Sequence, residues 1–205
     1  MSLDDDLQRV AGKIASPPPG GAGHPFRNEV TWRPPLDEGR VAAYEHEWGI
    51  TLPADYRAFI TRVAGSGDWP HHGLIGLDAA DRDKADAPDP AAPFPFSPAG
   101  PLTPADETAY RGALGRGEPD RGWIPLCTEG CGMDTILVVT AVDPGTAGTV
   151  WYFDVAHDCG VLPMVHPSTG EPLRFLEWLE LCLDARASGE EPCGSDLVPS
   201  EFLPW

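Results

Sequence analysis

Two amphipathic segments separated by a short break constrain the fold of this chain more than any other feature of its sequence. In the first segment, Val41, Tyr44 and Trp48 recur at intervals of three and four residues, the spacing of one helix face. Gly49 follows where a helix end favours a positive φ, and Pro53 suits the first position of a second helix because its missing N–H needs no partner there. The residues expected on the buried face of that second helix are Tyr56, Phe59, Ile60 and Val63. The pattern predicts two consecutive, packed helices.

The second half of the chain is rich in β-branched and aromatic residues, which favour strands. Strands are expected at Leu74–Leu77, Trp123–Cys127, Thr135–Val142, Gly148–Val155 and, as a short edge strand, Val161–Val165. Pro163 limits pairing in the last of these. A closing helix is expected between Pro172 and Gly189, with an apolar face made of Phe175, Leu176, Leu179, Cys182 and Leu183. Helices, then strands, then a helix predict an α+β fold.

The length and composition indicate one domain with appended ends. A chain of 205 residues with 41% hydrophobic residues is large enough for one core. Near the N-terminus the apolar residues with helical spacing are Leu3, Leu7, Val10 and Ile14. A Pro/Gly-rich stretch at residues 16–25 then interrupts any helix. The expected parts are an N-terminal helical arm and linker at 1–30, a globular domain at 31–187 and an acidic tail at 188–205. We expect the arm to dock on the domain.

Acidic side chains greatly outnumber basic ones. The sequence has 32 Asp and Glu against 14 Lys and Arg, for a formal net charge of −18. Such a surface repels phosphate groups, which disfavours direct binding to nucleic acid or to a membrane surface. It attracts a basic protein partner, although acidity that only maintains solubility is the simpler alternative. The sequence shows no apolar run of transmembrane length, and aspartates stand where a secretory signal carries positive charge. We therefore expect a cytoplasmic protein.

The five cysteines are scattered and odd in number, which predicts reduced thiols rather than a disulfide framework. Cys127 and Cys131 have three residues between them, but His157 and Cys159 do not form the second pair that a structural zinc site uses. Thiolate catalysis would need Cys131 beside His157 or His166, and nothing local supplies oxyanion donors or an orienting carboxylate. We expect no metal, cofactor or catalytic residues, and keep a small Cys131-dependent hydrolase as the less favoured alternative.

The sequence GSGDWPHHG, residues 65–73, allows two interpretations. In the structural one, Trp69 folds back over the helix pair, Pro70 stiffens the turn and both histidines are exposed caps. In the functional one, Trp69 anchors a protein partner and Asp68 belongs to a polar rim, the composition of an interface hot spot. A proline-rich stretch expected to form a long surface loop follows. The carboxylates expected there to steer a basic partner are Asp78, Asp81, Asp83 and Asp86.

Several segments, in matching order, resemble the SUKH superfamily, whose members are related to the yeast cell-wall-assembly regulator and abound in bacteria as immunity proteins. The segments are GITLPADYRAFI (49–60), GLIGL (73–77), CTEGCGMDTILVVT (127–140), GTVWYFD (148–154) and FLEWLELCLD (175–184). The resemblance runs from about Leu36 to Ala187. The residues that carry it, all expected to be structural, are Leu52, Pro53, Tyr56, Phe59, Gly130, Cys131, Gly132, Trp151 and Trp178.

The resemblance implies a single α+β domain in which helices pack on a curved, mainly antiparallel sheet and a C-terminal helix closes the domain. It also implies protein binding rather than catalysis. Bacterial members are thought to neutralise polymorphic toxins, often nucleases, by capping them, and other members serve as adaptors. The expected function is stoichiometric occlusion of a basic toxin domain. A regulatory scaffold like the yeast relative is the alternative.

Overall fold

The structure is a computed structural model that describes residues 2–15, 30–77, 89–97, 121–154, 156–157, 160–190 and 194–200. The helices in these ranges are α1 (Leu3–Ala15), α2 (Glu38–Trp48), α3 (Ala54–Arg62), α6 (Phe175–Ala187) and the 3-10 helix η1 (Gly194–Leu197). The strands are β1 (Trp32–Arg33), β2 (Ser66–Gly67), β3 (Trp123–Gly130), β4 (Met133–Val138), β5 (Val150–Asp154) and β6 (Gly160–Pro163). β1 pairs with β2, and β3 to β6 form a second antiparallel sheet in sequence order. The predicted α+β class is confirmed.

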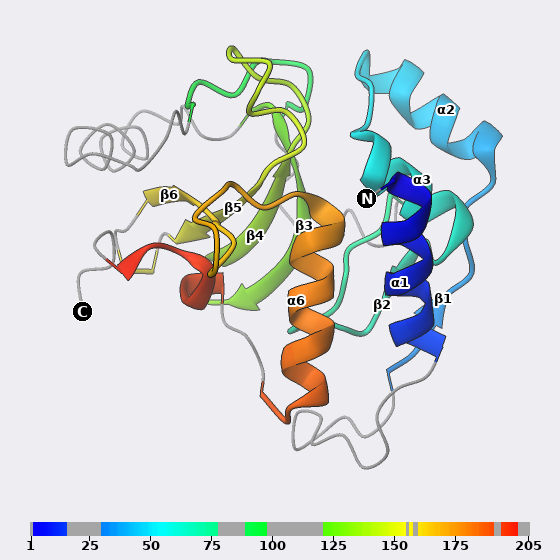
Figure 1. Ribbon diagram of the computed structural model, residues 1–205. Helices are drawn as coiled ribbons and strands as arrows, with labels where there is room; N and C mark the ends of the chain where they lie inside the picture. The colour runs from blue at the N-terminus through cyan, green and yellow to red at the C-terminus, as the bar shows by residue number, and fades with distance from the viewer. Residues whose placement is uncertain are drawn as a thin grey trace.

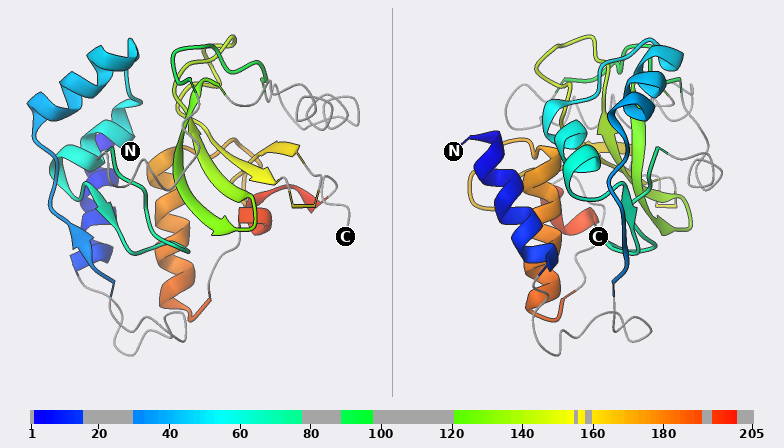
Figure 2. Two further views of the ribbon diagram at one scale, coloured as in Figure 1. Left: turned by 180° about the vertical axis from the view of Figure 1, so that it is seen from behind. Right: turned by 90° about the vertical axis from the view of Figure 1, so that its right-hand side faces the viewer.

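The elements are arranged in layers, with α6 in the middle. One side of α6 faces the curved four-stranded sheet, and the other side carries α1 and α3 (Figures 1 and 2). α1 and α6 lie side by side and run in the same direction (Figure 1). The closing helix predicted from the sequence is therefore a central element, because it is covered on both sides.

The paired helices α2 and α3 form where the sequence predicts them. The side chain of Asp37 accepts a hydrogen bond from the backbone N–H of Gly39 and so caps the start of α2. Gly49 ends α2 with the expected positive φ, at 64°. Pro53 lies one position earlier than predicted: it is the N-cap of α3, and its carbonyl accepts from the N–H of Arg57 at 2.8 Å.

The β3–β4 hairpin turns through the Gly-Cys-Gly sequence. Gly130 pairs with Met133, so Cys131 and Gly132 form a two-residue loop in which both residues have positive φ, at 56° and 81°. This is the backbone of a type I′ turn, which matches the twist of the flanking strands. Cys131 is a non-glycine residue in the left-handed region, and its side chain is exposed at the tip of the hairpin. The turn geometry explains why glycines flank it.

The strand predicted at Leu74–Leu77 is not formed. Leu74 makes only an isolated bridge to Gly67, while the N–H of Ile75 donates to the carbonyl of Leu126 at 2.7 Å. The segment thus runs beside the edge of β3 without a continuous ladder. The apolar residues Leu74, Ile75 and Leu77 predicted a strand here, but the segment follows a turn that ends at Gly73 (φ 115°) and makes only an isolated bridge within the described residues.

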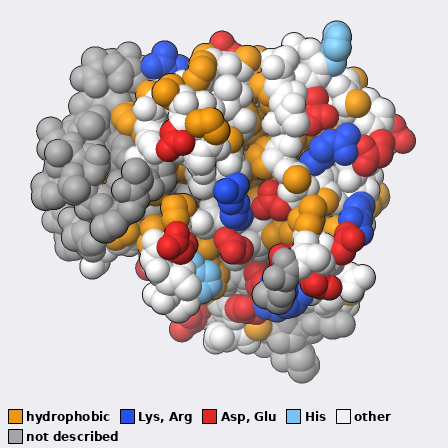
Figure 3. Space-filling model, turned by 45° about the horizontal axis from the view of Figure 1, so that its top comes forward, with side chains coloured by type: hydrophobic (Ala, Val, Ile, Leu, Met, Phe, Trp, Pro, Cys, Tyr) orange, Lys and Arg blue, Asp and Glu red, His pale blue; other side chains and the backbone are white. Residues whose placement is uncertain are grey.

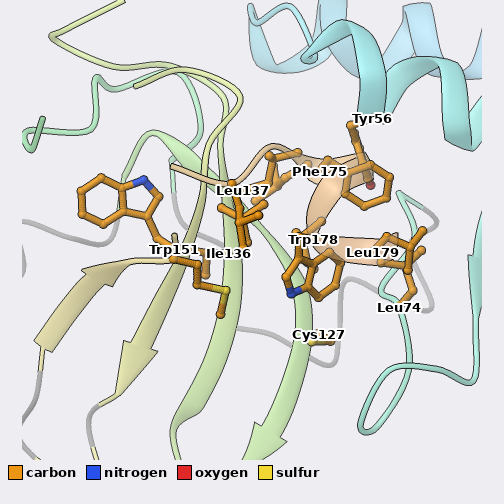
Figure 4. Close-up of a cluster of buried hydrophobic side chains, with 14 of the residues drawn as sticks. Tyr56, Leu74, Cys127, Ile136, Leu137, Trp151, Phe175, Trp178 and Leu179 are labelled. Carbon is orange, nitrogen blue, oxygen red and sulfur yellow. The ribbon is translucent and has the colours of Figure 1, made fainter. Parts of the chain in front are cut away.

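The core lies between α6 and the sheet and continues to α3. Phe175, Trp178 and Leu179 of α6 are buried there (Figure 4). The rings of Phe175 and Tyr56 pack edge to face, with 4.9 Å between their centroids. Trp151 lies on the other side of the sheet, where the centroid of its ring is 4.9 Å from that of the Phe94 ring. Both faces of the sheet therefore bury large side chains, and the expected structural residues Leu52, Phe59, Trp151 and Trp178 are all in this core.

Candidate interaction site

The loop that allowed two interpretations buries its tryptophan. Trp69 is 2% exposed, and the guanidinium carbon of Arg186 on α6 lies 5.8 Å from the centre of its ring. A buried indole cannot serve as an anchor for a partner in this conformation, so the structure does not support that interpretation. The helix that covers Trp69 is α6, which is far away in the sequence and was not the expected α2–α3 pair. No local pattern could have identified that neighbour.

The two histidines of the loop differ in environment. His72 is exposed, whereas the side chain of His71 is 10% exposed, with its Nε2 3.5 Å from Oε1 of Glu129. Burial lowers the pKa of His71 to about 4, and the nearby His72 adds to the effect. His71 is therefore neutral at neutral pH and belongs to the packing of the loop. This corrects the prediction that both histidines are exposed caps.

Glu129 ties the C-terminal segment to the same loop. Its Oε1 accepts a hydrogen bond from the backbone N–H of Gly194 at 2.6 Å, at the start of η1. The carbonyl of Leu197 in η1 accepts from the N–H of Val165 at 2.8 Å, and Leu197 is buried. The described part of the acidic tail is thus docked on the domain.

A small hollow lies beside the loop. Its polar lining comes from Arg33, Asp68, His72 and Thr128, and Leu74 and Ile75 complete it. The free volume is about 40 Å³, which is enough for a few water molecules but not for an organic substrate. Asp68 is partly exposed at this hollow. The four aspartates expected to steer a partner, Asp78, Asp81, Asp83 and Asp86, lie outside the described residues.

The thiols fall into two classes. Cys127 and Cys182 are buried, and burial raises the pKa of both, which keeps them protonated and unreactive. Cys131 is exposed, but in the described part of the chain no hydrogen bond links it to a histidine. His157 is held instead by the carboxylate of Asp154, at 3.0 Å from Nδ1. Nothing in these contacts forms a thiolate–imidazole pair at Cys131.

Metal-binding groups do not converge in the part of the chain that the structure describes: no three His, Cys, Asp or Glu residues there are placed to share an ion. Cys159 and Cys193 are outside this part. On the face shown in Figure 3, acidic and basic side chains lie next to each other among apolar ones. The net negative charge is thus not expressed there as one continuous patch.

Two carboxylates on α6 are paired with cations from the N-terminal helix of the same chain. Nε and Nη2 of Arg9 donate to the two carboxylate oxygens of Glu180, at 2.7 and 2.8 Å. Nζ of Lys13 lies 2.8 Å from Glu180 and also contacts Asp184. The hydrogen bonds from Arg9 lower the pKa of Glu180, and Lys13 adds to this effect. The sequence did contain a signal, since both the cations and the carboxylates recur at four residues, but it did not show that the two helices meet.

Glu177, another carboxylate of α6, has a local role: its side chain accepts from the backbone N–H of Arg174 and so closes the capping box of α6. Glu45 of α2 is partly buried and accepts from the N–H of Leu52 at 2.9 Å. It thereby stabilises the break between α2 and α3.

Comparison with known proteins identifies the family. The sequence model of the SMI1 / KNR4 family (SUKH-1) matches residues 35–174, more than half of the chain. The chain belongs to the SUKH-1 family. No curated protein and no solved structure matches. The resemblance stated from the sequence is therefore confirmed.

The SUKH-1 match extends from just before α2 to the residue that precedes α6, so α1, α6 and η1 lie outside it. Membership supports an immunity-type or regulator-type domain that acts without catalysis. None of the described helices has the length and apolar character needed to cross a bilayer.

Proposed function

We propose that this SUKH-1 domain is a non-enzymatic immunity protein that neutralises a basic toxin domain, such as a nuclease, by stoichiometric occlusion. The observation that carries the proposal is a net charge of −18 on a member of a family of binding domains. A nuclease cleft that binds phosphate groups is positively charged, so an acidic protein is attracted to it and competes with the nucleic acid. The buried thiols and the small hollow agree with binding rather than turnover.

The first test is co-expression of a toxin-like protein encoded beside this chain, with and without the chain. We expect protection of the cells and a one-to-one complex that co-purifies at low salt. Unchanged toxicity together with no complex would contradict the proposal.

A second test concerns the steering cluster. Replacing Asp78, Asp81, Asp83 and Asp86 by Asn should slow association with the toxin by about tenfold at low salt, because steering charges act mainly on the association rate. The charge-matched control replaces four exposed glutamates, Glu38, Glu47, Glu171 and Glu190, by Gln. Equal effects of the two variants would show that only the net charge matters and that this cluster is not the contact.

Two other functions remain as alternatives. A hydrolase that uses Cys131 would lose activity in a Cys131→Ser variant that still folds, whereas an occluding protein should keep full protection. A regulatory scaffold would bind partners through free ends. In the described residues, however, both end segments contact the domain, α1 on α6 and η1 at Glu129. This docking favours the occlusion model.

A further inference from the structure

The helix α1 is seated on a face of the domain that has its own charge pattern. Arg62 of α3 lies at one end of this face and contacts Asp4 at 2.7 Å. Glu180 and Asp184 of α6 lie further along and contact Arg9 and Lys13. We call the surface formed by Arg62, Glu180 and Asp184, with the apolar residues between them, the α1-docking face. Its order of charges sets the direction in which a helix can lie on it.

The attachment of α1 is weaker than that of a core helix. Only Leu7 and Val10 of α1 are buried, while Leu3 is 39% exposed. The side chains of Arg9 and Lys13 are 35% and 30% exposed to solvent, so water and salt reach these ion pairs. The α1-docking face therefore binds its occupant through a narrow apolar stripe and through charges that another helix could supply.

The position of α1 in the sequence also indicates that it is an appended element. α1 lies outside the part of the chain that matches the family, and residues 16–29, which separate it from the domain, include the sequence SPPPGGAG. A helix joined to the domain through a Pro/Gly-rich stretch can act as an intramolecular ligand. The linker keeps the effective concentration of this helix at its docking site high. The tether explains how a weak contact stays occupied.

We propose that the α1-docking face is the contact site for the partner, and that α1 is an exchangeable occupant which a basic amphipathic helix of the partner replaces. This inference rests on the proposed function, because it assumes a basic protein partner. The replacing helix carries apolar residues at the positions of Leu7, Val10 and Ile14 and cations at those of Arg9 and Lys13. An acidic first turn, as at Asp4, pairs with Arg62. Removal of α1 takes Arg9 and Lys13 away from Glu180 and Asp184, which leaves more local negative charge for the partner.

Exchange is tested first without the partner, on the full chain. The probe is a fluorescent, end-blocked peptide of residues 2–15, and the measurement is its anisotropy at low salt. In the Arg9→Gln/Lys13→Gln chain the tethered α1 is a weaker competitor, so the peptide should bind at least about tenfold more tightly than to the wild-type chain. A probe peptide that carries the same two substitutions should not bind.

The matched control is Gln8→Glu/Ala15→Glu. It changes the net charge by the same two units at exposed positions of α1 and leaves Gly12 in place. This control should bind the probe peptide as the wild type does. Equal peptide affinity in all three chains, or no binding to any, would overturn the exchange. Thermal melting of each chain confirms that the variants are folded.

The partner is tested next, with the toxin identified by co-expression. Arg9→Gln/Lys13→Gln weakens only the internal competitor, so the chain should bind the toxin about fivefold to tenfold more tightly, while the control stays unchanged. A toxin complex with unchanged or lower affinity overturns this inference and leaves the proposed function standing. Absence of any toxin complex, in contrast, contradicts the proposed function, whether or not the peptide exchanges.

Discussion

At the scale of single residues, backbone geometry makes two glycines respond in opposite ways to the same substitution. Gly122 has a φ of +78°, and a Cβ there would overlap the backbone N of Phe94 and the carbonyl oxygen of Thr140. Gly12 is exposed on α1, with open space around it. The first position therefore depends on having no side chain, and the second does not.

We expect Gly122→Ala to lower the free energy of unfolding by about 2 kcal/mol or more, because the backbone has to move. Gly12→Ala should raise it by about 0.5–1 kcal/mol, since alanine is the better helix former. Urea denaturation of both variants measures these changes. A loss of stability at Gly12, or none at Gly122, would contradict the described backbone.

His71 provides a second prediction at this scale. Its pKa is lowered to about 4 from 6.5, so between these pH values the unfolded chain binds a proton that the folded chain excludes. The free energy of unfolding therefore falls as the pH falls from 6.5 to 4, by up to about 3 kcal/mol from this residue. Other groups close to His71 are Glu129, His72 and Asp196.

The variant that isolates this effect is His71→Asn, because asparagine also tolerates the positive φ of 50° found there. Its stability should depend less on pH between 6.5 and 4 than that of the wild type, as measured by urea denaturation at several pH values. His72→Asn changes the exposed neighbour and should behave as the wild type does. Identical pH dependence in all three chains would exclude His71 as the cause.

At the scale of elements, α1 should be the first helix to detach. The pKa of Glu180 is lowered from 4.5 by Arg9 and Lys13, so its stabilising contribution is present above pH 4.5 and is lost as the pH falls below that value. Each partly exposed ion pair contributes about 1 kcal/mol or less, and salt screens it further. Hydrogen exchange measured by mass spectrometry should show α1 losing protection at acidic pH or high salt while α6 keeps it. Loss of protection in both helices together would show that α1 is an integral part of the core.

At the scale of the whole molecule, the excess of 32 acidic over 14 basic residues should govern association. We expect the affinity for the toxin to fall by at least about tenfold between roughly 50 mM and 500 mM salt, because the Debye length shrinks from about 14 Å to about 4 Å. Titration calorimetry across this range measures the slope, and an unrelated basic protein serves as the control for unspecific attraction. An affinity that does not depend on salt would place the binding energy in apolar contacts instead.

Local patterns predicted most of the elements because helix and strand periodicity depends only on neighbouring residues. Leu7 and Val10 occupy the buried face predicted for the N-terminal helix, and Gly49 ends α2 as expected. The missing strand at Leu74–Leu77 shows the limit of this approach, since a short apolar run needs a partner of matching length to become a strand. The burial of individual side chains could not be predicted from local patterns either. His71 and His72 are adjacent in the sequence, yet the first is nearly buried and the second is exposed.

The sequence by itself determined the α+β class and the strong negative charge, because these follow from composition and from patterns among residues near in the chain, and the order of its motifs determined the family. Only the tertiary structure decided that Trp69 is covered by α6 and that Arg9 meets Glu180, 171 positions away. An amphipathic helix shows in its sequence that one face will be covered, but not by what. The covering element is selected by the packing of the whole chain, and here that packing places Arg9 and Lys13 of α1 against the carboxylates of α6.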